Sequence, residues 1–152
     1  MTMNGRAVGD PLTDNGWWET GYRWHDALHV AHVACLGWSP IFRTLAGLKR
    51  RSTPRVDHIE DGGRAAVADE AIAWTVFCHA RTRDWYENRP LDADLLDYVE
   101  EMTYGLEAAA RSRDELAHAI RCGLAAMLAL WRHDGGVLVG DQYERSLTWR
   151  AD

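Results

Sequence analysis

A run of helix-forming residues from Arg64 to about Arg83 contains the stretch AAVADEAIAWTVFCHA, which is apolar on most faces of a helix. A helix that is apolar nearly all round is stable only when other elements cover it. A chain of 152 residues is long enough to form one hydrophobic core around such a helix. We therefore predict a single helical domain with this segment at its centre.

Two helices are predicted before this segment. Residues 21–36 carry apolar side chains at helical spacing and are followed by Gly37, a typical C-cap residue. Ser39 and Pro40 then match the N-cap and the first position of a shorter helix, which is expected to run to about residue 48.

Two more helices are predicted after it. Asp92 is placed to cap a helix that runs to about residue 109. Ser112 and Glu115 have the spacing of a capping box, which predicts the start of a helix ending near residue 133. Together these segments predict an all-α fold of five helices.

The two ends of the chain have a different pattern. Residues 1–20 include the turn-forming stretch GDPLTDNG and are predicted to be an irregular arm, which leaves residues 21–152 as the domain. Near the C-terminus, two short runs of β-forming residues flank a polar turn. They predict a small hairpin that pairs residues 137–140 with residues 147–149.

Charge and composition exclude several classes of function. The chain has 17 basic and 23 acidic residues, so we expect no sequence-independent binding to nucleic acid and no binding to an anionic membrane. No apolar run reaches about 18 residues and no signal-peptide core is present, so we expect a cytoplasmic protein. Cys35, Cys78 and Cys122 lie far apart without a CxxC pair, and neither a disulfide scaffold nor a thiolate zinc site is expected.

The first helix carries a cluster of polar side chains. His25, Asp26, His29 and His32 lie close together in a helix that is otherwise apolar. Residues 25, 29 and 32 share one helical face, and Asp26 with His29 is an i, i+3 pair that can hold one metal ion. A solvent-facing polar stripe is the alternative. The cost of desolvating several imidazoles and a carboxylate favours a functional site.

The long helix contains a second pair of candidates, Asp69 and Glu70. Glu70 shares a helical stripe with Val67, Trp74 and Phe77, so its carboxylate is expected on the core side, where a metal ion or a basic partner would compensate its charge. The alternative is that Asp69 faces water and Glu70 pairs with an arginine of the same helix.

Further candidates lie between the two helices. Asp61 can cap the long helix, and Glu60 directly before it can reach a metal ion bound between helices. Lys49, Arg50 and Arg51 concentrate positive charge in one loop of an acidic protein, which suits a phosphate-bearing ligand. A solvated connector is the alternative for this loop.

The motifs GYRWHDALHVAH, LGWSP and EDGGRAAVADEAIA, with the tail GGVLV…SLTW, resemble a known family. They are similar to the domain appended C-terminally to some bacterial MazG-type nucleoside triphosphate pyrophosphohydrolases, in a sequence that holds this domain alone. The resemblance runs from about Gly9 to Trp149. It implies an all-α, MazG-like bundle, and it favours a homodimer because helix pairs of this kind commonly complete their cores across a dimer interface.

The resemblance also implies a chemistry. MazG catalytic domains bind Mg²⁺ through E-E-x-x-E on one helix and E-x-x-D on the next long helix, and they cleave nucleoside triphosphates between the α and β phosphates. Here His25, Asp26 and His29 occupy the spacing of the first motif, and Glu70 with Ala73 resembles the second without its last ligand. Because Mg²⁺ prefers carboxylate oxygens to imidazole, the expected divalent metal shifts from Mg²⁺ toward Mn²⁺, Zn²⁺ or another transition metal.

The sequence therefore favours a metal-dependent nucleotide phosphohydrolase of the nucleoside triphosphate pyrophosphohydrolase type with an altered metal site. A non-catalytic module that binds a nucleotide or a partner, such as a separate MazG catalytic subunit, is the first alternative. An HD-type phosphohydrolase or nuclease, suggested by the dipeptide His25-Asp26, is the second. The expected roles are catalytic for Asp26, His29 and Glu70; phosphate-binding for Lys49, Arg50 and Arg51; and metal-ligating for His25, Asp26, His29, Glu60, Asp61 and Glu70.

Overall fold

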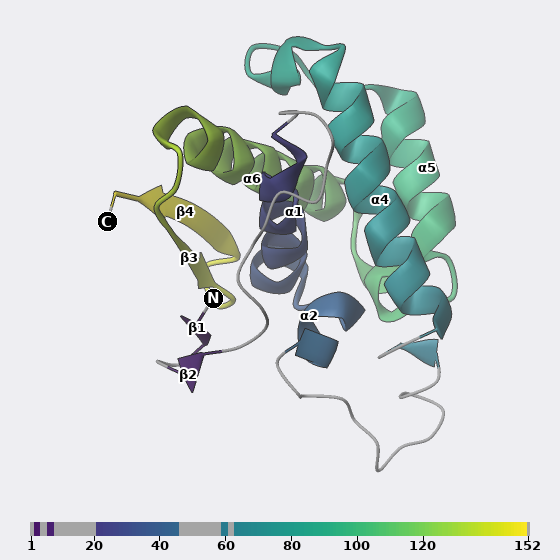
Figure 1. The fold of residues 1–152 in the computed structure, drawn as a ribbon. Helices are drawn as coiled ribbons and strands as arrows, with labels where there is room; N and C mark the ends of the chain where they lie inside the picture. The colour runs from purple at the N-terminus through teal and green to yellow at the C-terminus, as the bar shows by residue number, and fades with distance from the viewer. Residues whose placement is uncertain (1, 4–5, 8–20, 46–58, 61–62, 152) are drawn as a thin grey trace.

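The structure is a computed structural model in which residues 2–3, 6–7, 21–45, 59–60 and 63–151 are described. Five α-helices and a C-terminal hairpin make up most of this part of the chain (Figure 1), as the sequence predicts. The α-helices are α1 (Asp26–Ala31), α2 (Pro40–Leu45), α4 (Gly63–Arg81), α5 (Ala93–Thr103) and α6 (Arg113–His133). The short helical segments are η1 (Tyr22–Trp24), η2 (His32–Leu36), η3 (Asp84–Tyr86) and η4 (Glu107–Ala110). The strands are β1 (Thr2–Met3), β2 (Arg6–Ala7), β3 (Val137–Asp141) and β4 (Ser146–Arg150).

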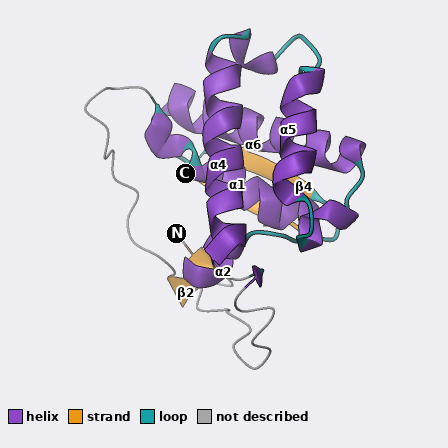
Figure 2. Ribbon diagram, turned by 90° about the vertical axis from the view of Figure 1, so that its right-hand side faces the viewer, coloured by secondary structure: helices purple, strands orange, loops and turns teal. Residues whose placement is uncertain are grey.

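The helices form two packed layers, one of α4 and α5 and one of α1 and α6. Helix α4 lies between α5 on one side and α1 on the other, and α6 crosses next to α1 (Figure 1). The view in Figure 2 shows α4 and α5 side by side, with β4 behind them. The hairpin packs on α6 and η2, away from α5. One hydrophobic core contains residues of α1, α4, α5 and α6, together with Trp38 shortly before α2.

The first helical segment is bounded by two glycines, as its sequence pattern suggests. Gly21 and Gly37 have φ angles of 74° and 68°, a left-handed conformation that favours glycine. Between them α1 passes directly into η2, whose five residues form a π-helical turn. Such turns widen a helix locally and are frequent at functional sites. The prediction that this segment ends at Gly37 is confirmed.

Helix α4 buries one continuous stripe of residues, and small side chains dominate it. The buried residues are Ala65, Ala68, Asp69, Ile72, Ala73, Val76, Phe77 and Ala80. Their spacing is that of a core-facing helix. The stripe predicted to carry Glu70 to the core side is instead largely exposed: Val67 is 67% exposed and Trp74 is 50% exposed. The expected core position of Glu70 is therefore wrong, and its neighbour Asp69 is the buried carboxylate.

Helices α5 and α6 begin as predicted. Asp92 is the N-cap of α5, although its carboxylate accepts hydrogen bonds from Arg83, Tyr86 and Arg89 instead of capping the helix. Helix α5 ends earlier than expected, because Gly105 turns the chain with a φ of 73° and η4 follows. Both hydrogen bonds of the predicted capping box between Ser112 and Glu115 start α6.

The ends of the chain complete the fold. Residues 137–141 pair antiparallel with residues 146–150, which confirms the predicted hairpin and extends it. In the N-terminal arm, β1 and β2 form a minimal antiparallel pair, Thr2 with Ala7 and Met3 with Arg6.

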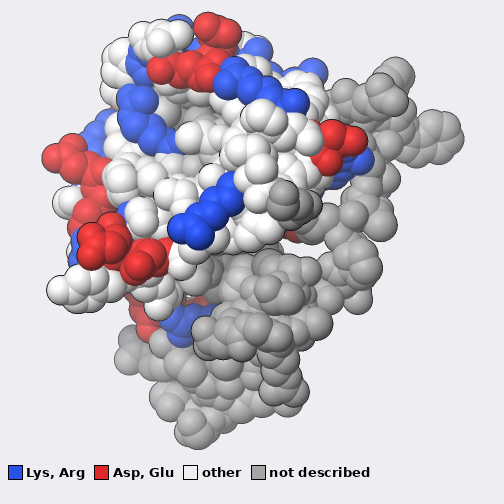
Figure 3. Space-filling model, turned by 90° about the vertical axis from the view of Figure 1, so that its left-hand side faces the viewer, with Lys and Arg blue, Asp and Glu red and all other residues white. Residues whose placement is uncertain are grey.

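The described surface carries charges of both signs. On the face drawn in Figure 3, acidic and basic side chains lie in small interspersed groups. None of the helices in the described ranges is long and apolar enough to cross a membrane.

Candidate metal centre

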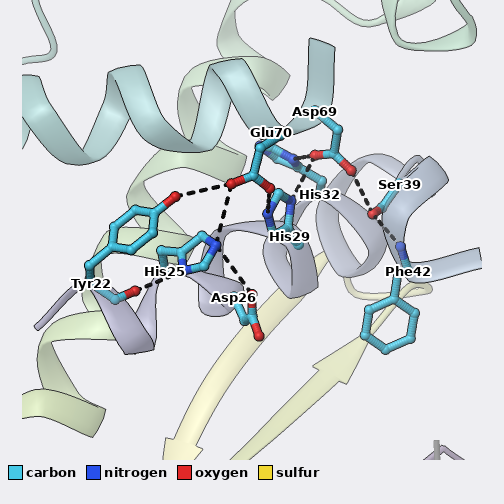
Figure 4. A network of polar contacts seen from close by, with 9 residues as sticks. All are labelled: Tyr22, His25, Asp26, His29, His32, Ser39, Phe42, Asp69 and Glu70. Carbon is cyan, nitrogen blue, oxygen red and sulfur yellow. Dashed lines mark hydrogen bonds and ion pairs between the residues drawn. The ribbon is translucent and has the colours of Figure 1, made fainter. Parts of the chain in front are cut away.

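The polar residues of the first helix face α4. The two helices are antiparallel, because later residues of the first helical segment contact earlier residues of α4. Tyr22, directly before α1, lies edge-on to Phe77 with ring centroids 5.1 Å apart, whereas His32, directly after α1, contacts Asp69. This arrangement lines up the histidines of one helix with the two carboxylates of the other (Figure 4).

Asp69 is the centre of the buried half of this network. Its side chain is fully buried, and its Oδ1 accepts hydrogen bonds from His29 Nδ1 at 3.0 Å and from His32 Nδ1 at 2.7 Å. The Ser39 hydroxyl donates to Oδ2 at 2.8 Å, while Ser39 Oγ accepts the backbone N–H of Phe42 at the start of α2. Three donors therefore compensate the desolvation of this carboxylate.

The hydrogen bonds and charges of this network lower the pKa of Asp69 and raise the pKa of His29. Burial by itself raises the pKa of Asp69, but the hydrogen bonds from His29 and His32 outweigh burial and hold the pKa well below its usual range. Burial lowers the pKa of His29, and the hydrogen bonds to Asp69 and Glu70 outweigh it, raising the pKa to about 10. The imidazole of His29 is thus held between two carboxylates.

The outer half of the network meets the solvent at Glu70, whose side chain is 48% exposed. Glu70 Oε2 lies 3.2 Å from His29 Nε2, and Glu70 Oε1 lies 3.6 Å from His25 Nε2. The Tyr22 hydroxyl donates to Oε1 at 3.0 Å. The contacts with His25 and His29 hold the pKa of Glu70 below its usual range, so this carboxylate is ionised at neutral pH.

The two imidazoles of the outer half are oriented in the same way. His29 donates its Nδ1–H to Asp69, and His25 donates its Nδ1–H to the backbone carbonyl of Tyr22 at 2.7 Å. Each ring therefore directs Nε2 toward Glu70 (Figure 4). Metal-ligating histidines usually donate their second N–H to a carboxylate or a backbone carbonyl in this way, which fixes the ring. A metal ion at His29 Nε2 would displace the proton that His29 shares with Glu70.

His25, His29 and Glu70 therefore have the properties of a metal-binding set. One ligand atom from each lies within 4.8 Å of the others. Two imidazole nitrogens and a carboxylate oxygen suit Mn²⁺, Zn²⁺ or another transition metal better than Mg²⁺. Asp26 Oδ1, 3.4 Å from His25 Nε2, adds a further carboxylate beside the set. The inner set of His29, His32 and Asp69 also has this spacing, but it is wholly buried.

An apolar depression lies next to Glu70. It is open to solvent and is lined by Tyr22, Ile41, Ala66, Val67, Glu70, Ala71 and Trp74. The Trp74 and Tyr22 rings meet edge-to-face with centroids 5.1 Å apart. An exposed aromatic face beside a candidate metal centre can stack on a planar ligand such as a nucleobase.

The structure places the predicted site residues in three groups. His25, Asp26, His29 and Glu70 lie together, as described above. Glu60 has a different partner, because its Oε2 accepts the backbone N–H of Glu107 at 3.1 Å, and it belongs to none of the candidate ligand sets among the described residues. The other predicted residues lie outside the described residues: Asp61, Lys49, Arg50 and Arg51.

Ser39 and Tyr22 have no predicted role in the site, and Asp69 is a candidate from the sequence without a predicted catalytic or metal-ligating role. For Asp69 a signal was available, because it lies four residues from both Ala65 and Ala73 in the buried stripe of α4. Ser39 was predicted only as an N-cap, and it combines that role with its bond to Asp69. Nothing in the local sequence points to the contact of Tyr22 with Glu70, 48 residues away.

Comparisons with known proteins give one finding. The family model described as MazG C-terminal domain matches residues 1–152. No curated protein and no solved structure matches the chain.

Proposed function

Because the chain belongs to the MazG C-terminal domain family, we propose that it is a metal-dependent nucleotide phosphohydrolase of the nucleoside triphosphate pyrophosphohydrolase type. His25, His29 and Glu70 would hold the metal ion. The observation that carries the proposal is the shared orientation of the two imidazoles, which direct Nε2 toward the same half-exposed carboxylate while Nδ1 is hydrogen-bonded behind them.

The charge of the site supports a role for a cation. Asp26, Asp69 and Glu70 place three carboxylates within one network. These groups repel the phosphates of a nucleotide unless a cation lies between them and the ligand. A divalent cation bound there would polarise a phosphoryl oxygen and lower the pKa of a water molecule.

The side chains around the metal set have distinct roles in this proposal. Asp69 fixes the His29 ring, and the Tyr22 hydroxyl fixes the Glu70 carboxylate. Asp26, partly exposed beside His25, would be the carboxylate that accepts the proton of the attacking water.

The apolar depression supports a nucleotide as the ligand. A base that stacks on Trp74 would lie next to Glu70 and would direct its phosphates toward the metal set. The predicted phosphate contacts of Lys49, Arg50 and Arg51 belong to the same proposal.

The experiment is a hydrolysis screen with purified protein, nucleoside and deoxynucleoside triphosphates, and Mn²⁺, Zn²⁺ or Mg²⁺. We expect release of pyrophosphate and a nucleoside monophosphate, with Mn²⁺ or Zn²⁺ more effective than Mg²⁺. Glu70→Gln is expected to lose this activity. Glu101→Gln, which removes an exposed carboxylate of α5, is the matched control and should leave it unchanged.

The alternative is a nucleotide-binding module without catalysis. Imidazoles stand where the resembled motif has two of its carboxylates, and this departure favours the alternative. Nucleotide binding that depends on Trp74 and Glu70, without product release under any of the metals, would establish it and contradict the enzymatic proposal.

A further inference from the structure

A second group of metal-ligand side chains lies on the other side of the first helical segment. Cys35 belongs to η2, and His118 and Cys122 are one turn apart on α6. One ligand atom from each lies within 4.8 Å of the others, and the group shares no residue with the candidate centre on α4. The expectation of no thiolate site considered only cysteines that are close in sequence, whereas packing of η2 on α6 brings Cys35 to Cys122.

The histidine of this group is oriented by the hairpin. His118 Nε2 lies 2.8 Å from the backbone carbonyl oxygen of Arg145 and donates its hydrogen to it. The lone pair of this tautomer is then on Nδ1, and Cys122 Sγ lies 4.0 Å from Nδ1 and 3.5 Å from Nε2. A metal ion bound at Nδ1 would leave the Nε2–H on the Arg145 carbonyl, which is a usual second partner of a metal-ligating histidine.

The sulfur atoms have suitable surroundings as well. Cys35 is buried and Cys122 is half-buried.

We propose that Cys35, His118 and Cys122 bind a thiophilic divalent cation, with Zn²⁺ as the best match. Zinc–sulfur bonds of about 2.3 Å and zinc–nitrogen bonds of about 2.0–2.1 Å, at a tetrahedral angle, separate sulfur and nitrogen ligands by roughly 3.6 Å. Cys122 Sγ lies 4.0 Å from His118 Nδ1 and 3.5 Å from Nε2, so a small rotation of the ring would bring Nδ1 to this separation. Three protein ligands leave the fourth position of the cation open.

Such a site has a structural consequence. The three ligands come from η2 and α6, and the hydrogen bond from His118 connects them to the hairpin at Arg145. Binding would release the protons of both thiols to the solvent and would stabilise the folded chain, because the unfolded chain does not hold the three ligands together.

The test is a Co²⁺ titration of the reduced, full-length protein. Cobalt bound by thiolates absorbs in the near ultraviolet through sulfur-to-metal charge transfer, whereas the centre at His25, His29 and Glu70 offers no sulfur. This readout is therefore independent of the proposed function. We expect the band to saturate at one Co²⁺ per chain, to disappear when Zn²⁺ is added, and to be accompanied by a higher thermal unfolding midpoint.

Variants identify the ligands. Cys122→Ser should abolish the band, and His118→Ala, at an exposed position that folding does not require, should weaken Co²⁺ binding at least tenfold. Cys78→Ser is the matched control, because Cys78 belongs to none of the ligand sets in the described part of the chain, and it should titrate like the parent. Absence of the band in the reduced parent, or a band retained in Cys122→Ser, would overturn the proposal. Conversion of Cys35 and Cys122 to a disulfide, with no band before oxidation, would overturn it as well.

Discussion

Asp69 has three hydrogen-bond donors around a carboxylate that no solvent reaches. Removing one member of a buried charged network leaves the others desolvated and unpaired, and this costs more than the network itself contributes to stability. Glu70, one residue further, has a half-exposed side chain and water as an alternative partner. The two adjacent carboxylates of α4 should therefore respond differently to substitution.

Asp69→Ala is expected to lower the free energy of unfolding by about 3–5 kcal/mol, because it leaves His29, His32 and Ser39 without their acceptor. Glu70→Gln should lower it by less than about 1 kcal/mol, because water replaces the lost interactions. Urea denaturation in the presence of a chelator measures both values. Equal losses in the two variants would contradict the separation into a buried and an outer half.

The stability of the chelated protein should depend on pH through the same residues. The folded-state pKa of His29 is about 10, above its ordinary 6.5, so its contribution is complete below pH 6.5 and is lost as the pH rises toward 10. The pKa values of Asp69 and Glu70 are lowered from 3.8 and 4.5, so their contributions are present above these values and are lost in acid.

We therefore expect the greatest free energy of unfolding between about pH 4.5 and 6.5, with a decline on both sides. His29→Gln should remove the alkaline part of the decline. Denaturation curves across this range, for the parent and the variant, make the comparison. Parallel curves above pH 6.5 would rule out a raised pKa for His29.

At the scale of elements, the position of α1 depends on how closely α6 approaches it. Gly123 of α6 faces α1, and a Cβ at this position would lie 2.8 Å from Leu28 Cδ2 and 3.1 Å from Leu28 Cα. The second contact is to backbone, which cannot rotate away. This close approach holds α1 against α6, and α1 in turn presents His25 and His29 to α4.

Gly123→Ala tests this packing, because two effects oppose each other. Alanine improves helix propensity by about 1 kcal/mol, while overpacking a close helix contact costs about 1–3 kcal/mol. Since the backbone of Leu28 must move, we expect a net loss of stability in thermal or urea denaturation. Ala125→Gly, at an exposed position of the same helix, measures the propensity term alone. A stabilised Gly123→Ala protein would show that α1 and α6 have room to separate.

At the scale of the whole molecule, the described surface keeps several large apolar side chains in contact with solvent. Tyr104, Trp131, Val137 and Tyr143 are exposed, in addition to Val67 and Trp74 beside the candidate centre. Exposed apolar groups of this size are commonly buried when a chain associates with a copy of itself.

The resemblance to MazG-like proteins predicts a homodimer, and the mass in solution tests this. Sedimentation equilibrium at micromolar concentration should give about twice the 17.2 kDa of one chain. The measurement should be repeated with a chelator, so that association through added metal ions is distinguished from association through the protein surface. A mass near 17.2 kDa in both conditions would exclude the dimer.

Local signals in the sequence were sufficient to predict most of the helices and the hairpin. Gly37 ends the first segment, and the Ser112–Glu115 capping box starts α6, because these residues act on backbone groups within one helical turn. The spacing of His25 and His29 also placed them on one face of α1, since this follows from helical geometry alone. The predicted end of α5 overlooked Gly105, which is itself a local signal, whereas tertiary packing decided the exposed position of Glu70.

Only the tertiary structure decided which residues meet across the helices. Asp69 under His29 and His32, Tyr22 against Glu70, and Cys35 beside Cys122 are contacts between segments far apart in the chain. Their pairing depends on how α1, η2, α4 and α6 pack, which is the sum of many small contacts spread over the whole core. No short stretch of sequence contains that sum. The local sequence therefore determines the helices and their candidate ligands, but not the partners that complete each site.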